Sequence, residues 1–263
     1  MKKLRLGIIG YGFMGQWHNN HAGTLEEVEI VAICDTDPEK RAEAPENVKL
    51  YTDYKALLAD SDVEWVMISV PNHLHHDIAI DAAKAKKNII VEKPCALNVQ
   101  EFDEMYQAAK DNGVLFTVDQ NRRWDRDYCT VKKVLEQNSI GKVFMVKSSH
   151  YGVFGRMHDW HEYPECGGGM LYDWGVHLID QMLDLIPGKI TQISADMKCA
   201  VNKSVDDYFR ILLYFDNGLA AEIELGTFLL KKLPRWYVAG DTGTLVVENI
   251  KADEGAIYRA KEF

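Results

Sequence analysis

The fold is decided by the stretch Leu4-Arg5-Leu6-Gly7-Ile8-Ile9-Gly10-Tyr11-Gly12-Phe13-Met14-Gly15 near the start of the chain. Its apolar first half predicts a short buried strand, and the run over residues 16–26 predicts a helix. Glycines spaced Gly-x-Gly-x-x-Gly between a strand and a helix are the fingerprint of a dinucleotide-binding turn, where the helix N-terminus offers unpaired amides to the phosphates. The predicted cofactor-binding residues of this turn are Gly10, Gly12, Phe13, Met14 and Gly15.

The second predicted strand, over residues 29–34, ends on Asp35, about 20 residues beyond the last fingerprint glycine, as the fingerprint requires. An acid at this point accepts hydrogen bonds from the ribose hydroxyls of NAD and repels the 2′-phosphate of NADP. We therefore predict NAD as the cofactor, with NADP less favoured. The alternative is that Asp35-Thr36-Asp37-Pro38 is only a turn and a helix cap.

Strand and helix patterns alternate over the first part of the chain. Further strands are predicted over 48–51, 63–70, 88–91 and 114–118, and helices over 54–59, about 73–86 and 99–112. This alternation predicts a doubly wound parallel sheet in an N-terminal domain, residues 1–120.

Lys93 stands at the end of the strand over 88–91, in the sequence Glu92-Lys93-Pro94. Open α/β sheets bind ligands beyond the carboxyl ends of their strands, and Pro94 restricts the backbone of Lys93. Pro71 and Asn72 likewise follow directly after the preceding predicted strand, over 63–70.

A group of histidines, His73, His75 and His76, follows directly and invites a metal hypothesis. Their spacing does not complete a ligand set, so we predict no metal site. We expect some of these groups to line the cofactor crevice or to cap the helix.

Strands dominate the rest of the chain, residues 121–263, which we expect to form an α+β domain with a mostly antiparallel open sheet. Strands are predicted over 143–151, 190–201, 208–215, 220–227 and 236–239, with a hairpin turn at 216–218. One helix, over about 170–185, carries Asp173 and His177 four residues apart. An acid one turn from a histidine suits general acid–base chemistry, although such pairs are also common as plain surface contacts.

Composition narrows the class of protein. The chain has 263 residues, 47% of them hydrophobic, and a net charge of −10 with no local basic patch. We therefore expect no nucleic-acid or membrane partner. An apolar stretch of bilayer length and a signal-peptide layout are both lacking, so we expect a cytoplasmic protein. The five widely spaced cysteines predict free thiols.

Taken together, these motifs resemble the Gfo/Idh/MocA oxidoreductases, the group of glucose-fructose oxidoreductase and inositol dehydrogenase. The residues that carry the resemblance are the fingerprint, Pro71-Asn72 with His75, Glu92-Lys93-Pro94, Arg122-Arg123 and Gly167-Gly168-Gly169 followed by Asp173, Gly175 and His177. The resemblance implies a Rossmann domain, a C-terminal domain whose open sheet forms homodimers or homotetramers, and hydride exchange between a nicotinamide cofactor and a sugar or polyol. Pro71, Asn72, His75, Glu92 and Lys93 are then expected at the cofactor.

The resemblance also implies the reactive groups, because Lys93 matches the lysine of the family's Glu-Lys-Pro motif, and Asp173 and His177 match its Asp-x-x-x-His pair. We expect the substrate hydroxyl between Lys93 and His177, with the acid–base role open between these two residues. Candidate substrate contacts are Lys93, Arg123, Trp124, His158, Asp173 and His177, and more weakly His161, Tyr151 and Tyr163.

Two further expectations concern the length of the chain and its self-association. The sequence is short at its C-terminus for this family, which leaves a non-catalytic NAD-binding regulator, or a truncated inactive relative, as the alternative function. We also expect self-association through the strands within 190–227, whose apolar content exceeds what one helix layer covers.

Overall fold

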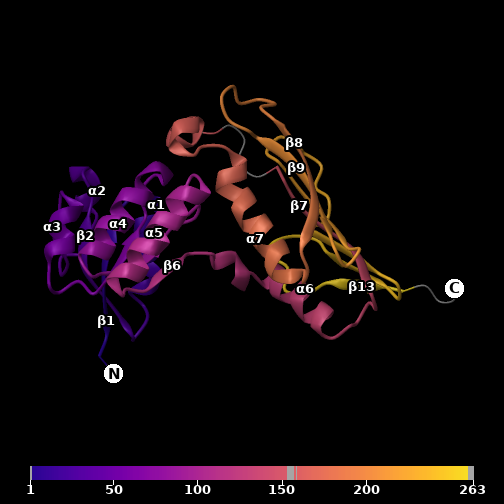
Figure 1. Ribbon diagram of the computed structural model, residues 1–263, viewed down its shortest axis with the longest axis horizontal. Helices are drawn as coiled ribbons and strands as arrows, with labels where there is room; N and C mark the ends of the chain where they lie inside the picture. Colours follow the sequence, from indigo (N-terminus) through magenta and orange to yellow (C-terminus); the bar gives the residue numbers. More distant parts are fainter. Residues whose placement is uncertain (1, 153–156, 158, 260–263) are drawn as a thin grey trace. The chain divides into compact units, whose positions relative to one another are not determined.

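The chain divides into two compact units, Met1–Asp119 and Gln120–Phe263, in a computed structural model (Figure 1). The structure describes residues 2–152, 157 and 159–259. Each unit has its own sheet and its own hydrophobic core.

The first unit is built on six parallel strands in the order β3-β2-β1-β4-β5-β6. The strands are β1 (Leu4–Ile9), β2 (Val28–Cys34), β3 (Lys49–Tyr51), β4 (Trp65–Ile68), β5 (Asn88–Val91) and β6 (Phe116–Val118). This is the strand order of the Rossmann fold, with its reversal between β1 and β4. The predicted doubly wound parallel sheet is confirmed.

Helices cover both faces of this sheet. Neighbouring side chains of β1 show this, since they point to opposite faces and enter different cores. Ile9 joins a core with side chains of three helices, whereas Ile8 joins a second core beside α1. The helices are α1 (Phe13–Ala22), α2 (Pro38–Ala42), α3 (Tyr54–Ala59), α4 (His75–Lys84) and α5 (Val99–Asn112). Helix α1 begins three residues before the predicted 16–26, because Gly12 is already its N-cap.

Helix α5 has the bounds that the sequence predicts, and its ends show why. The Asn98 side chain accepts a hydrogen bond from the Glu101 amide at 2.9 Å and donates to the Glu101 carboxylate at 2.8 Å. At the other end Gly113 adopts a φ of 67°, the left-handed conformation that ends many helices.

The second unit is a seven-stranded sheet in the order β13-β12-β11-β7-β10-β9-β8. Its strands are β7 (Val143–Tyr151), β8 (Ile190–Lys198), β9 (Tyr208–Phe215), β10 (Ala220–Gly226), β11 (Trp236–Gly240), β12 (Thr244–Val247) and β13 (Ala256–Tyr258). All pairs are antiparallel except β7 with β10, so the sheet is mixed but mostly antiparallel, as predicted. Strands β12 and β13 were not predicted.

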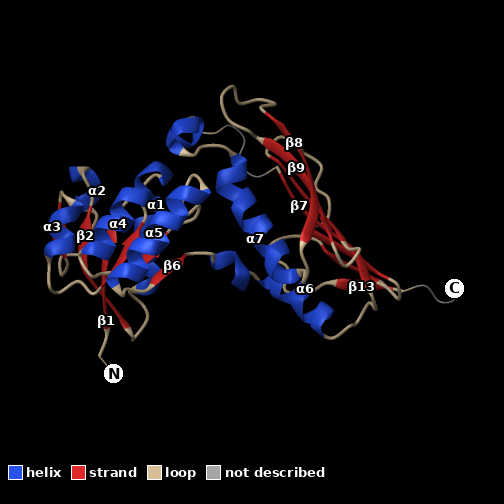
Figure 2. Ribbon diagram, viewed as in Figure 1, coloured by secondary structure: helices blue, strands red, loops and turns tan. Residues whose placement is uncertain are grey.

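One face of this second sheet is covered by α6 (Arg126–Glu136) and α7 (Val176–Leu185), which lie on the same side of the strands in Figure 2. Tyr128 of α6 and Leu178 of α7 share a core with the inward side chains of β9 and β10. The strands alternate buried and exposed residues, as expected of a sheet with one covered face.

The opposite face of the sheet is mixed over residues 190–227, with charged groups on its central strands beside exposed apolar side chains such as Tyr214. Glu222 binds Lys147 at 3.1 Å and Arg210 at 2.8 Å, and Glu224 accepts hydrogen bonds from the Tyr151 and Tyr208 hydroxyls. Other large exposed apolar side chains include Ile193 and Met197 on β8, and Phe228, Leu229, Leu230 and Leu233 in the connection from β10 to β11.

Two further expectations can be compared with the structure. Among the described residues, no helix combines the length and the hydropathy that crossing a bilayer needs. All five cysteines are free thiols, as predicted.

Candidate active site

The fingerprint glycines are held by close backbone contacts. Gly10 has a φ of 91°, and a Cβ atom there would lie 2.5 Å from the Ser69 carbonyl oxygen. A Cβ atom on Gly15 would lie 2.0 Å from the Gly10 carbonyl oxygen, so only glycine lets α1 approach β1 this closely.

Gly12 differs, because the nearest atom to a Cβ built there is the Lys40 Nζ at 4.0 Å. Gly12 is the N-cap of α1 and supplies no capping side chain, and Phe13 beside it is 83% exposed. The first turn of α1 is therefore open to a ligand, and its amides and positive dipole end suit a pyrophosphate. The residues present fit a dinucleotide.

Asp35 links the end of β2 to the fingerprint turn. Its carboxylate accepts the Tyr11 amide at 2.7 Å and the Asp37 amide at 2.9 Å. Each carboxylate oxygen has two lone pairs, so capacity remains for ligand hydroxyls. The turn-and-cap interpretation is correct for Asp37, whose side chain caps α2 by accepting the Glu39 amide.

His75 joins the loops that follow β4 and β5. Its side chain is fully buried, with Nδ1 2.9 Å from the Pro94 carbonyl oxygen and Nε2 2.9 Å from that of Val70. Burial lowers the pKa of this histidine, and the hydrogen bonds to the Pro94 and Val70 carbonyl groups oppose this shift. Because its ring faces two carbonyl groups, His75 fixes the loops and presents no free nitrogen to a cofactor.

The other residues of this segment have separate surroundings. Asn72 is buried in the short 3₁₀ helix η1 (Asn72–Leu74), and His73 is exposed. His76 binds Asp77 and Glu104, each at 2.8 Å. The three histidines therefore do not converge on one point.

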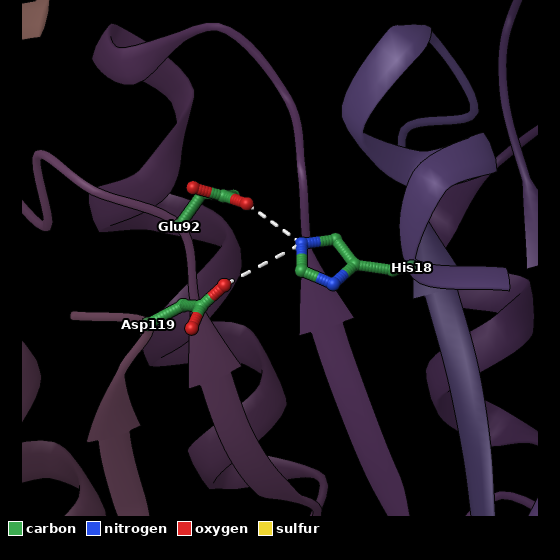
Figure 3. Close-up of side chains that lie close together, drawn as sticks. All are labelled: His18, Glu92 and Asp119. Atoms are coloured by element: carbon green, nitrogen blue, oxygen red, sulfur yellow. Dashed lines mark hydrogen bonds and ion pairs between the residues drawn. The ribbon is translucent and has the colours of Figure 1, made fainter. Parts of the chain in front are cut away.

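A cluster that the sequence did not predict lies at the ends of β5 and β6 (Figure 3). His18 of α1 places Nε2 2.6 Å from the Glu92 Oε1 and 3.7 Å from the Asp119 Oδ2. The other oxygen of Glu92 accepts the Lys93 amide at 3.1 Å. His18 and Glu92 are buried, and Lys93 is partly exposed beside them, with a cis peptide bond to Pro94.

The ligand atoms of His18, Glu92 and Asp119 all lie within 4.8 Å of one another, a spacing that could suit a metal. The 2.6 Å between His18 Nε2 and Glu92 Oε1 is a direct hydrogen bond. A metal bound by both atoms at about 2.0–2.2 Å needs them further apart, so this arrangement does not fit a metal.

The second unit carries Asp173 and His177 where two helix types meet. Residues Leu171–Gly175 form a π-helical turn, η5, and α7 continues from Val176. The predicted single α-helix over 170–185 is wrong in this first turn, so regular four-residue spacing does not describe the pair. Gly175 permits close packing here, since a Cβ atom on it would lie 3.2 Å from Phe209.

Trp174 lies between Asp173 and His177 in the sequence, and its ring contacts three other side chains. The Arg122 guanidinium lies 4.0 Å from its ring, the His150 ring stacks on it at 4.0 Å, and the His177 ring meets it edge-on at 6.0 Å. Burial, followed by the charges of Arg235 and Arg122, lowers the pKa of His150 to about 3. His150 is therefore a neutral group in a cationic environment.

The predicted substrate contacts of the second unit each have their own surroundings. Arg123 forms a two-point ion pair with Asp180, at 2.8 and 2.6 Å, so its guanidinium already has a carboxylate partner. Trp124 is 82% exposed, and Tyr163 is also exposed. His161 stacks on Trp160, Tyr151 bonds to Glu224 on the open face of the sheet, and His158 lies outside the described residues.

A buried polar network, also not predicted, supports this region. Arg235 lies 3.2 Å from Asp127 and donates to the side chains of Gln181, at 2.7 Å, and Ser148. Gln181 in turn donates to the Arg122 carbonyl oxygen at 2.7 Å. The network thus connects α6, α7, β7 and the residue before β11 to Arg122, which contacts Trp174.

The fold and the fingerprint define the class of protein: a dinucleotide-binding protein with a Rossmann unit. Two family models match, one described as an oxidoreductase family with an NAD-binding Rossmann fold, over residues 4–120, and one as the GFO/IDH/MocA C-terminal domain, over 128–246. The chain belongs to the Gfo/Idh/MocA oxidoreductase family, which confirms the resemblance seen in the sequence.

Relatives and solved structures agree with this placement. A crystal structure of an NAD-binding protein from Listeria innocua is 40% identical, with a TM-score of 0.93 over 97% of this chain and 76% of that one. Levoglucosan dehydrogenase, in complex with NADH and levoglucosan, superposes with a TM-score of 0.86 at 26% identity over 100% and 78% of the two chains.

Curated relatives include scyllo-inositol 2-dehydrogenase (NADP(+)) of Bacillus subtilis, 28% identical over 98% of this chain and 73% of its own length. An uncharacterized oxidoreductase of Schizosaccharomyces pombe is 35% identical over 67% of this chain. The chain spans about half, 49%, of that relative's length.

Proposed function

We propose that this chain acts as a nicotinamide-dependent dehydrogenase on the CH–OH group of a sugar, a polyol or a related hydroxy or keto compound. The observation that carries the proposal is Lys93, a lysine at the carboxyl end of β5 in the same parallel sheet as the fingerprint. Parallel strands end at one edge, so Lys93 and the fingerprint turn share the ligand-binding edge of the Rossmann unit. Inositol and levoglucosan dehydrogenases among the relatives support this substrate class.

The proposed cofactor is NAD, held by the amides of the first turn of α1 and by Asp35. The Asp35 carboxylate keeps lone pairs for ribose hydroxyls and its charge disfavours a 2′-phosphate. Lys40 and Arg41 are the nearby positive charges that would favour NADP, with the Arg41 guanidinium 2.6 Å from the Asp35 carbonyl oxygen.

In the proposed reaction, three side chains act on the substrate or on one another. When bound, the nicotinamide supplies the hydride acceptor or donor. His177 accepts the hydroxyl proton during oxidation, and Asp173 stabilises the imidazolium that results. The Lys93 ammonium stabilises negative charge that develops on the substrate. His75 holds the loops that follow β4 and β5 in the first unit, and Trp174 contacts the His177 ring in the second.

A non-catalytic NAD-binding regulator on the same fold is the second candidate, because the fingerprint and Asp35 would be enough to bind the cofactor. A regulator needs the fingerprint and Asp35 but has no use for Lys93, Asp173 and His177 together. The presence of all three favours the enzyme.

A substrate panel tests the proposal. The purified chain is mixed with NAD or NADP and with inositols, levoglucosan and common sugars, and the absorbance of the reduced cofactor is followed. Turnover of one compound, abolished in Lys93→Met, is the expected result. Cofactor binding by calorimetry without turnover of any compound would favour the regulator, and failure to bind either cofactor would exclude both functions.

Self-association stays a proposal as well. The apolar side chains on β8 and in the β10–β11 connection are the surface that suits a second copy of the chain, as a homodimer or homotetramer. A monomer by light scattering at micromolar concentration would contradict this.

A further inference from the structure

The π-helical turn η5, which carries Asp173, begins against a side chain from a distant part of the chain. The carboxylate of Asp206, in the connection from β8 to β9, accepts the Leu171 amide at 2.8 Å, and the Asp206 carbonyl oxygen accepts the Met170 amide at 2.9 Å. Amides at the start of a helix have no partner within the helix, so Asp206 supplies acceptors for two of them. The Asp173 amide donates to the Gly169 carbonyl oxygen, at 3.0 Å, within the turn itself.

Gly169 makes this close approach possible. Its φ is 96°, and a Cβ atom built on it would lie 2.3 Å from the Asp206 Oδ1. Glycine adopts this backbone conformation without strain and leaves room for the carboxylate, whereas any other residue would displace it. The last glycine of the run Gly167-Gly168-Gly169 thus lets Asp206 reach the first amides of η5.

The segment that carries Asp206 is anchored at both sides of the contact. The carboxylate of the next residue, Asp207, accepts the three successive amides of residues 200–202 at 2.6–2.7 Å. Further along, Phe209 of β9 is fully buried, and a Cβ atom on Gly175 at the end of η5 would lie 3.2 Å from its ring. The same segment therefore contacts η5 at its beginning and at its end.

We propose that Asp206 is a positioning residue for Asp173 and His177: its carboxylate fixes the start of η5 and so sets how these two side chains lie relative to each other. The inference rests on the proposed function for the reaction that the pair would carry out. Proton transfer depends on groups held in a narrow range of distances and angles, so a loosened turn lowers kcat more than it weakens cofactor binding.

Two substitutions at Asp206 test this role. Asp206→Ala removes the side-chain acceptor, whereas Asp206→Asn keeps an oxygen that can accept the Leu171 amide. In the alanine variant we expect faster hydrogen exchange of that amide and shifted NMR signals of the His177 ring nitrogens. We also expect kcat, on a compound that the substrate panel identifies, to fall at least about tenfold with little change in cofactor affinity. The asparagine variant should restore all of these values.

Asp216→Ala is the matched control, because Asp216 repeats the arrangement beyond the end of α7. Its carboxylate accepts the Lys189 amide at 3.0 Å, and a Cβ atom on Gly188, whose φ is 127°, would lie 2.7 Å from the same oxygen. This variant should leave the His177 signals and kcat unchanged. Asp206→Glu, which displaces the carboxylate by one carbon, replaces Asp206→Ala if the alanine variant does not fold, and the same direction is expected.

Unchanged His177 signals in a folded Asp206→Ala protein would overturn the proposal, and so would an unchanged kcat in an active one. A failure of the proposed function looks different, since the unmodified protein then turns over no compound. In that case, His177 signals that move in Asp206→Ala and return in Asp206→Asn would still support the positioning role while contradicting the dehydrogenase.

Discussion

The two sheets of this molecule use their polar residues in opposite ways. In the first unit both faces of the sheet are covered by helices, and Asp35, Glu92 and Asp119 stand just beyond the ends of three strands. In the second unit one face is open, and the buried ion pair of Asp127 and Arg235 lies on the covered face of the sheet. Strand ends can hold reactive groups at little structural cost, whereas charges on a core face must be matched for the unit to fold.

Lys93→Met gives the largest expected effect and tests the strand-end half of this comparison. We expect kcat to fall at least about 10³-fold, because a charge that stabilises the reacting oxygen is removed. NAD affinity, measured by calorimetry, should change little. Lys84→Met, at an exposed position of α4, is the control, and a Lys93→Met protein with most of its kcat would show that the lysine only packs or binds cofactor.

Arg235→Met tests the other part of the comparison, the buried ion pair on the covered face of the second sheet. The change leaves the Asp127 carboxylate buried without its ion-pair partner, which costs about 3–5 kcal/mol. Hydrogen exchange of β11 amides should accelerate accordingly, while those of the first unit keep their rates. Arg126→Met removes an exposed partner of Asp253, 3.4 Å away, and should cost at most about 1 kcal/mol. Equal losses in the two variants would contradict the structural role of the buried pair.

Asp207 offers a stability effect with a defined pH dependence. Its buried carboxylate accepts the amides of Ala200, Val201 and Asn202, at 2.6–2.7 Å, and these bonds hold the pKa below its usual value near 3.8 although burial opposes them. A depressed folded pKa means that the stabilisation is present above the unfolded value and is lost as pH falls through the folded one.

Asp207→Ala should therefore cost about 1–3 kcal/mol at pH 7, with a difference from the parent protein that shrinks in acid. Urea unfolding at several pH values, followed by a probe in the second unit, measures this. A difference that persists unchanged at the lowest pH would show that the carboxylate charge is unimportant.

Asp35→Ala probes the strand end next to the fingerprint. Removing the charge that repels a 2′-phosphate should narrow the preference for NAD over NADP by about tenfold, or 1.4 kcal/mol. Dissociation constants of both cofactors measure it. Asp37→Ala, which removes the α2 cap, is the control, and equal affinities for the two cofactors in the unmodified protein would remove the basis of the prediction.

The smallest expected effect concerns Asp173 and the pH profile. If His177 accepts the proton, kcat/KM for oxidation should rise with pH through one ionisation and then level off. Asp173→Asn should move that ionisation to lower pH, because an amide cannot stabilise a charged ring. A profile unchanged in His177→Ala and lost in Lys93→Met would assign the acid–base role to the lysine.

The sequence predicted residues at strand ends of the first sheet more completely than residues buried on the covered face of the second sheet. Strand-end residues such as Asp35 and Lys93 come directly after apolar runs, so the sequence marks them, and Asp119 after β6 carries the same signal but was not predicted. The partners Asp127, Gln181 and Arg235 lie in separate segments and meet only in the folded sheet. The π turn at Leu171–Gly175 has no pattern of its own, because one added residue in a helical turn leaves the apolar spacing nearly unchanged.

The contacts around Gly10 and Gly15 also bear on the entropy of cofactor binding. A Cβ atom on Gly15 would come within 2.0 Å of the Gly10 oxygen, so turn and helix touch backbone to backbone. Fixing a residue's backbone costs about 1–2 kcal/mol in conformational entropy. In this turn that cost falls on folding, so an arriving dinucleotide meets amides that already point outward, and the first turn of α1 needs no reordering to receive it.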